Sequence, residues 1–236
     1  MQIIEVTDLG VRSAVLILKR RETAMQFMVF PMIHFAEARF YASVQKRLGD
    51  CQIVVAEGIQ GPSASTRAIT RSYRLLKHKK SLGMVEQNLD YDVLDAEIVR
   101  PDLTGEAMDD AWGEIPLRQR VLTELSVPIF AAWMLGFGTR RVIAHELATD
   151  DLPSPQQQAD EDAMRESFGE TEELIMDRRD QLLIDALARI HEEHCTEPIK
   201  VAVVYGAHHV TPMVRALHRR FGYIARRGEW LDMMSL

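Results

Sequence analysis

Two adjacent histidines, His208 and His209, stand where the apolar segment VAVVY gives way to GAHHVTPM. Two other residues suited to chemistry also follow apolar runs, since His34 comes after AMQFMVFPMI and Glu57 after CQIVVA. Two imidazoles and a carboxylate can bind a divalent metal and leave a coordination position open for water, as hydrolytic sites require. The sequence therefore raises the hypothesis of a metal centre built from His34, Glu57 and one histidine of the pair.

These side chains can meet only if the strands before them are parallel, because loops after parallel strands converge at one edge of a sheet. Apolar residues recur every four positions between 35 and 48, which predicts a helix between the strands AMQFMVFPM and CQIVVAEG. Such a unit is normally parallel and right-handed. SAVLILKR and AMQFMVFPM, joined by a polar turn, indicate a hairpin. We expect an α/β fold, a single domain with a central, mostly parallel sheet, antiparallel edge strands and flanking helices.

The closing part of the chain repeats this arrangement. A helix is expected near 172–192, then the strand KVAVVY, a helix near 212–220 and a last strand pair within YIARRGEWLDMM. Thr211 can cap the second helix, with Pro212 at its first position. His209 would then lie close to a helix N-terminus, where the dipole disfavours the imidazolium and keeps the ring in the neutral form that binds metal.

The middle section, 62–148, is expected to be mostly helical with short strands near MVEQ and AEIVR. Its apolar run VPIFAAWMLGF is about half the roughly 20 residues of a spanning helix, so it predicts a core helix. The polar segment ATDDLPSPQQQADED, 148–162, predicts a mobile loop. The stretch from Arg67 to Lys80 holds six Lys or Arg and no acid, which fits a solvated helix face or a site for phosphate or an acidic partner.

Composition limits the classes of partner. The 236-residue chain has a net charge of −7 and a pI near 5.6, which opposes any global attraction to nucleic acid. Cys51 and Cys195 form no disulfide framework or metal motif, and the N-terminus lacks the features of a secretory signal. We expect a cytoplasmic protein without a transmembrane segment that acts on a peptide or a small molecule.

The helix near 172–192 supplies a further candidate, Arg179, at the centre of its apolar stripe. The stripe consists of Ile175, Leu182, Leu183, Ala186 and Ile190. An unpaired buried guanidinium would cost several kcal/mol, so Arg179 should meet a carboxylate, carbonyl groups or a ligand, and Glu57 is the expected partner. A structural ion pair, or an arginine that reaches solvent at the end of the stripe, is the alternative.

Three stretches together resemble the TraB/TIKI superfamily: FPMIHFAEARFYASVQKRLGDCQIVVAEGI, MDRRDQLLIDAL and VAVVYGAHHVTPM. That group includes pheromone-shutdown proteins and Wnt-inactivating metalloproteases and, more distantly, erythromycin esterases and haem-binding ChaN-type lipoproteins. The shared features are a histidine after a strand, a strand ending in glutamate, a helical Arg-Asp pair and a Gly-x-x-His motif. Here they fall on His34, Glu57, Arg179 with Asp180, and His209.

The resemblance implies a divalent-metal-dependent hydrolase, in particular a peptidase. It implies that His34, Glu57 and His209 bind the metal, which would be Mn, Co or Zn. Glu57 and Arg179 would be catalytic, with Arg179 holding Glu57 or a substrate carboxylate. All four residues should then cluster at one carboxyl edge of the sheet.

One residue departs from the family pattern, because Pro31 stands where glycine is usual. Proline removes a backbone donor and forbids a positive φ, which bears on how closely a ligand approaches that loop. A second hypothesis stays open beside the hydrolase, namely a catalytically inactive module on the same fold, which binds a small ligand or a protein and in which the histidines are structural.

Overall fold

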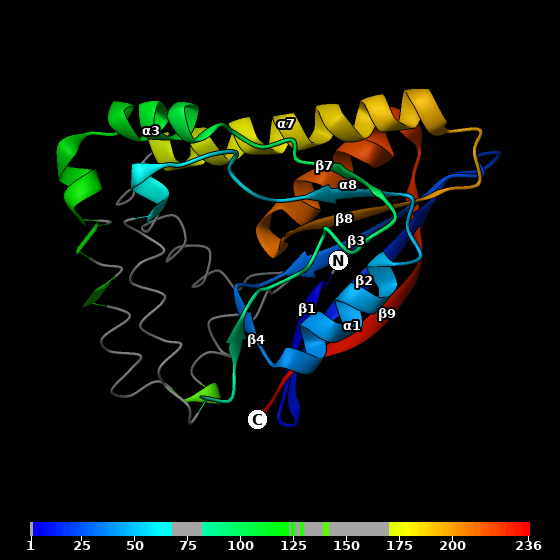
Figure 1. Ribbon diagram of the computed structural model, residues 1–236, viewed down its shortest axis with the longest axis horizontal. Coiled ribbons are helices and arrows are strands. Elements are labelled where there is room, and N and C mark those ends of the chain that lie inside the picture. The colour runs from blue at the N-terminus through cyan, green and yellow to red at the C-terminus, as the bar shows by residue number, and fades with distance from the viewer. Residues whose placement is uncertain (1, 68–81, 123, 126–127, 130–138, 142–169) are drawn as a thin grey trace, which may run out of the picture.

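The computed structural model describes residues 2–67, 82–122, 124–125, 128–129, 139–141 and 170–236. Within them a seven-stranded sheet has the order β1-β2-β3-β8-β5-β7, and β9 pairs with β2 (Figure 1). The strands are β1 (Ile4–Thr7), β2 (Gly10–Lys19), β3 (Gln26–Met32), β5 (Ile53–Ala56), β7 (Glu97–Val99), β8 (Lys200–Gly206) and β9 (Ile224–Ser235). The expected α/β class is confirmed.

The centre of the sheet is parallel, as predicted. β8 lies between β3 and β5 and is parallel to both, and β7 is parallel to β5. All four residues of β5 and the interior of β8 are buried, which explains why these strands are continuous apolar runs rather than alternating ones. Because Met32 pairs with Gly206, β3 and β8 end at the same edge.

The other side of the sheet is antiparallel. β2 forms the predicted hairpin with β3 and also pairs with β1 and β9. The expected strand pair at the C-terminus is wrong, since β9 is one strand that pairs with β2 from Gly10 to Lys19. The long edge of β2 holds this whole segment extended, with two register shifts along the pairing.

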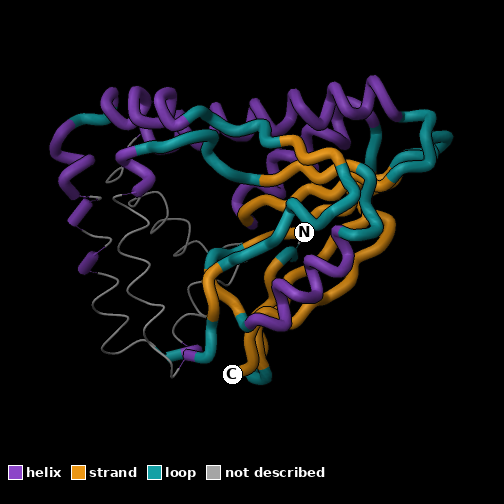
Figure 2. The backbone as a smooth tube through the Cα atoms, viewed as in Figure 1, coloured by secondary structure: helices purple, strands orange, loops and turns teal. Residues whose placement is uncertain are grey.

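Helices cover both faces of the sheet. α7 (Glu170–His194) and α8 (Ala207–Phe221) pack against each other on one side, while α1 (Ala38–Leu48) lies on the other side next to β9 (Figures 1 and 2). The two crossovers, β3 to β5 through α1 and β8 to β9 through α8, run in opposite directions across the sheet. If both are right-handed, their helices must lie on opposite faces.

The start of α8 differs from the prediction. β8 passes directly into the helix with Gly206 as its N-cap, so Thr211 is not the cap and Pro212 lies inside the helix. Both histidines therefore belong to the first turn of α8. Successive helical residues project about 100° apart, and this separates their side chains.

The middle section contains the two predicted short strands, as β7 and as β6 (Val85–Glu86), which pairs with β4 (Phe35–Ala36). It also contains α3 (Gly105–Glu114), which packs against α7. The expected loop at 148–162, most of the core helix at 127–137 and most of the basic stretch at 67–80 lie outside the described residues. In the part of the chain that the structure describes, no helix combines the length and the apolar character needed to cross a membrane.

Gly105 offers a first test of this fold. A Cβ atom at this position would lie 2.1 Å from the carbonyl oxygen of Pro62, a backbone atom that cannot move aside cheaply. We expect Gly105→Ala to lower the free energy of unfolding by roughly 1–3 kcal/mol, measured by urea denaturation. Gly113→Ala in the same helix is the control, because nothing lies within 4 Å of its Cβ position. Helix propensity should make the Gly113→Ala variant about 0.5–1 kcal/mol more stable. If Gly105→Ala were stabilised in the same way, the close packing of α3 on Pro62 would be contradicted.

Candidate active site

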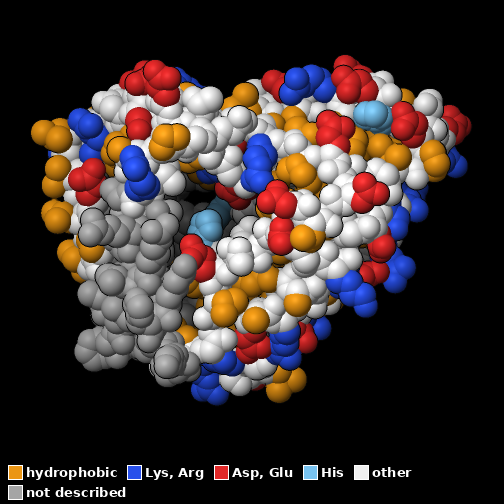
Figure 3. All heavy atoms as spheres, viewed as in Figure 1, with side chains coloured by type: hydrophobic (Ala, Val, Ile, Leu, Met, Phe, Trp, Pro, Cys, Tyr) orange, Lys and Arg blue, Asp and Glu red, His pale blue; other side chains and the backbone are white. Residues whose placement is uncertain are grey.

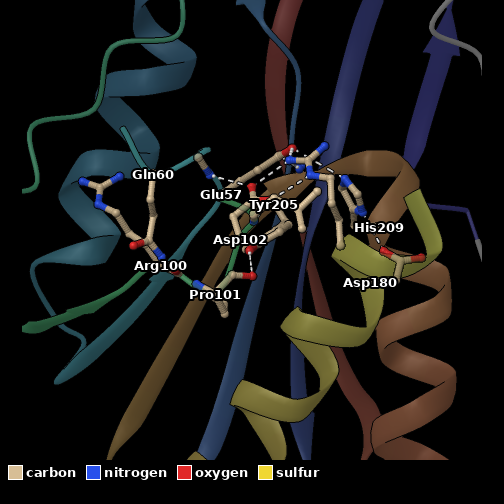
Figure 4. A network of polar contacts seen from close by, with 12 residues as sticks. Glu57, Gln60, Arg100, Pro101, Asp102, Asp180, Tyr205 and His209 are labelled. Atoms are coloured by element: carbon tan, nitrogen blue, oxygen red, sulfur yellow. Dashed lines mark hydrogen bonds and ion pairs between the residues drawn. The ribbon is translucent and has the colours of Figure 1, made fainter. Parts of the chain in front are cut away.

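Glu57 follows β5 at the carboxyl edge of the sheet, and its carboxylate faces the end of β8 (Figure 4). Its Oε2 accepts a hydrogen bond of 2.7 Å from the backbone N–H of Gly206. A Cβ atom on Gly206 would come within 3.2 Å of this oxygen, so glycine permits the close approach of the backbone to the carboxylate. The first residue of the Gly-x-x-His motif thus positions Glu57.

Arg179 reaches this edge from α7 and joins two carboxylates. Its Nη2 donates to Glu57 Oε1 at 2.7 Å and to Asp102 Oδ2 at 2.8 Å, and its Nε donates to Asp102 Oδ1 at 2.9 Å. The Asp102 side chain is 0% exposed and also accepts from the backbone N–H groups of Gly58 and Leu103. The predicted partnership of Arg179 with Glu57 is confirmed, with Asp102 as a second partner.

His209 is the buried histidine of the adjacent pair, with 3% of its side chain exposed. Its Nδ1 lies 2.6 Å from Asp180 Oδ1 and its Nε2 lies 3.5 Å from Glu57 Oε1. The ring also packs edge-on against Tyr205, with centroids 5.5 Å apart. Asp180, the residue after Arg179 on α7, therefore fixes the imidazole so that its other nitrogen faces Glu57.

These five residues, Glu57, Asp102, Arg179, Asp180 and His209, form what we call the Glu57 cluster. Desolvation by itself would raise the pKa of Glu57, but the hydrogen bond with His209, the charge of Arg179 and the Gly206 N–H lower it to about 2. Desolvation would likewise lower the pKa of His209, but its contacts with Asp180 and Glu57 raise it to about 9. The expectation of a neutral His209 is wrong for the metal-free protein, because two carboxylates outweigh the helix dipole.

The four sequence-predicted residues meet only in part. Glu57, Arg179 and His209 are brought together, and His208 is exposed on α8. His34 follows β3 at the same edge of the sheet, but its side chain is exposed. Among the residues that the structure describes, no group of three or more His, Cys, Asp and Glu side chains is placed to hold a metal ion. The three-ligand set of His34, Glu57 and His209 stays a prediction.

Pro31, the departure from the family pattern, lies within β3 opposite Tyr205. The pairing of β3 with β2 ends at Val29, so the missing N–H of Pro31 falls beyond that ladder. The Pro31 carbonyl accepts a hydrogen bond of 2.9 Å from the buried hydroxyl of Ser13. The proline is therefore accommodated by the sheet and does not enter the Glu57 cluster.

Sequence reasoning missed Asp102 and gave Asp180 no role beyond the Arg-Asp match. Asp102 stands three residues after β7, so the rule that singled out Glu57, an acid just after an apolar strand, applied to it as well. Only the strand order makes it relevant, because β7 lies beside β5. Asp180 carried no signal of its own, since a surface aspartate is ordinary on a helix.

Figure 3 shows charged side chains of both signs and a histidine gathered around a hollow in one face of the molecule.

No family model, curated protein or solved structure matches this chain. The assignment of a function therefore depends on the geometry and charge of the site.

The raised pKa of His209 predicts a specific dependence of stability on pH. A group with a pKa near 9 in the folded state and about 6.5 unfolded contributes stability that is fully present below pH ~6.5 and lost as the pH rises through 9. We expect the free energy of unfolding to fall by a few kcal/mol over that range. Glu57 contributes at acidic pH, because its pKa is lowered on folding: its stabilisation is lost as the pH falls from about 4.3 through 2.

Urea denaturation between pH 5 and 9.5 measures the alkaline loss of stability, and NMR titration of the His209 ring measures its pKa. Asp180→Asn is the matched variant, because it keeps the shape of the partner and removes its charge. The pKa of His209 should then move toward its ordinary value and the alkaline loss of stability should shrink. An unchanged titration in Asp180→Asn would show that Asp180 does not set the protonation of His209.

Proposed function

We propose that this chain is a divalent-metal-dependent hydrolase with its centre at Glu57 and His209, and that peptides are its candidate substrates. The observation that carries the proposal is the orientation of His209, with Nδ1 on Asp180 and Nε2 3.5 Å from Glu57 Oε1. A histidine that binds a metal usually donates the N–H of its other ring nitrogen to a carboxylate, a backbone carbonyl or water, and Asp180 can accept it here. This geometry supports Asp180 as the residue that orients the ring and His209 and Glu57 as two metal ligands.

The separation of the two donor atoms also fits a metal. Ligand atoms about 2.0–2.2 Å from a tetrahedral ion lie roughly 3.4 Å apart, close to the distance between His209 Nε2 and Glu57 Oε1. Charge favours a cation as well, because the Glu57 cluster has three carboxylates for one guanidinium and one imidazole. Once His209 loses its proton, the cluster holds excess negative charge that a divalent cation would offset.

When bound, the metal would supply an acidified water and polarise the scissile carbonyl. The protein groups around it hold the ligands in place. Asp180 fixes the ring of His209, the Gly206 N–H fixes Glu57 Oε2, and Arg179, anchored on Asp102, fixes Glu57 Oε1. The resemblance to the TraB/TIKI superfamily points to the same chemistry and to His34 as a third ligand.

Metal titration in two buffers of different ionisation enthalpy tests the proposal. His209 is protonated in the metal-free protein at neutral pH, so binding of Mn²⁺, Co²⁺ or Zn²⁺ should release about one proton per ion. Affinity should rise roughly tenfold per pH unit between pH 6 and 8, because the neutral ring is the ligand. The control His194→Ala, at the far end of α7, should bind metal like the wild type. Absence of binding, or binding without proton release, would contradict the site.

One observation favours a second function, a binding module without catalysis. Glu57 Oε1 already accepts from Arg179, and a protonated His209 compensates much of the remaining negative charge. A closed ion cluster of this kind stabilises the edge of the sheet without a metal. If purified protein binds no divalent cation at pH 8, where a growing fraction of His209 is neutral, this second function replaces the first.

A further inference from the structure

Arg100 lies beside the site and is not part of the Glu57 cluster. It follows β7 directly, and its exposed guanidinium stacks on the ring of Tyr91 with its carbon 5.1 Å from the ring centroid. In Figure 4 Arg100 and Gln60 lie on one side of Glu57, and Asp180 and His209 lie on the other. A molecule that extends from Glu57 away from His209 would therefore meet Arg100.

Gly58, the residue after Glu57, separates the carboxylate from Arg100. A Cβ atom at Gly58 would lie 3.6 Å from Arg100 Nη1, so the guanidinium rests against this glycine. The φ of Gly58 is 154°, a conformation that L side chains rarely adopt, and its N–H is held by Asp102. At Gly58, which lies between the Glu57 carboxylate and the Arg100 guanidinium, the protein therefore presents bare backbone rather than a side chain.

The segment that carries Arg100 is fixed in place. The Arg100 carbonyl accepts hydrogen bonds from the Asp102 N–H and from Gln60 Nε2, and the Pro101 carbonyl accepts one of 3.3 Å from the hydroxyl of Tyr205. Stacking on Tyr91 restricts the side chain as well. A guanidinium held in this way loses less conformational entropy when it binds an anion than a free surface arginine does.

Among the described residues, the charge of Arg100 faces an aromatic ring rather than a carboxylate. Within the described residues, Arg100 makes no ion pair with a carboxylate, in contrast to Arg179 with two carboxylate partners. Burial raises the pKa of the neighbouring Tyr91 to about 12, and although Arg100 lowers it and Glu57 raises it further, the hydroxyl stays neutral. A planar guanidinium that no described carboxylate pairs with is suited to a carboxylate or phosphate, which it binds through two parallel hydrogen bonds.

We propose that Arg100 binds an anionic group of the substrate, a carboxylate or a phosphate, while the bond to be cleaved lies at Glu57 and His209. The inference rests on the proposed function and narrows its substrates to anionic molecules, with peptides that bear a carboxylate near the cleaved bond as the peptide class. Arg100 would determine specificity, and Tyr91 would position it.

Amide NMR titrations of metal-free protein with succinate and with inorganic phosphate test the site without requiring catalysis. Wild-type protein should show saturable shifts at Gly58 and Arg100, and Arg100→Gln should weaken binding at least tenfold. Arg226→Gln, an equal change of charge at an exposed position of β9, should bind within twofold of the wild type. The probe that binds more tightly identifies the anionic group as carboxylate or phosphate. No saturable binding, or equal weakening in both variants, would overturn the inference.

His209→Ala separates this inference from the proposed function. That variant should lose metal binding yet keep succinate or phosphate binding within a few fold, because Arg100 does not contact His209. Loss of anion binding in His209→Ala with the fold intact would place the anion at the Glu57 cluster and overturn the role of Arg100. If anion binding at Arg100 holds while the wild type binds no metal, the hydrolase proposal fails and the anion site stands.

Discussion

Replacing Arg179 with methionine is expected to lower the free energy of unfolding by about 3–5 kcal/mol. The substitution keeps most of the apolar volume on α7 but leaves the fully buried Asp102 and the partly buried Glu57 without their shared counter-charge. Uncompensated carboxylates in such a site cost far more than the pair contributes when intact. Urea denaturation at pH 7 measures the difference.

Arg178→Met provides the control for this prediction. Arg178 precedes Arg179 on the same helix, but its contact with Glu114 is 3.7 Å long and both side chains are more than half exposed. We expect a change within about 0.5 kcal/mol. The double variant Arg179→Met with Asp102→Asn should recover part of the loss, since it removes one of the stranded charges. If Arg179→Met were as stable as Arg178→Met, the buried charge network would not exist as described.

His209→Ala is expected to abolish divalent-metal binding and any hydrolase activity, whereas His208→Ala should change neither by more than about twofold. His209 is buried between Asp180 and Glu57, while His208 is exposed in the same helical turn. Removing one ligand from a site with few protein ligands typically eliminates measurable binding. Calorimetric titration with Mn²⁺, Co²⁺ and Zn²⁺ compares the two variants.

The fold of His209→Ala must be checked, because the variant also removes the partner of Asp180. Circular dichroism and a thermal melt establish whether it remains folded at the titration temperature, and His209→Gln keeps a polar side chain if it does not. Equal losses in the two histidine variants would mean that the pair acts as a unit. A larger loss at His208 would place the site on the solvent side of α8.

Much of the fold follows from local patterns that act within short segments. Continuous apolar runs such as VAVVY and QIVVA are typical of strands buried on both faces, and with a helix predicted between two of these strands they favoured a parallel centre. A strand pair at the C-terminus was not the outcome, because the long edge of β2 offers β9 more hydrogen bonds than a hairpin would. The start of α8 was also misplaced. The sequence favoured Thr211 as the N-cap, but β8 runs directly into the helix and the N-cap is Gly206.

The sequence by itself indicated His34, Glu57, Arg179 and one histidine of the 208–209 pair as candidates, because polar residues that follow apolar strands gather at one sheet edge and a buried arginine must find a partner. Only the tertiary structure decided who those partners are. Asp102 joins Arg179 through the placement of β7 beside β5, and Asp180 joins His209 through the packing of α7 on α8. The pKa of His209 was decided in the same way, because the local helix dipole is weaker than two carboxylates brought close by distant parts of the chain.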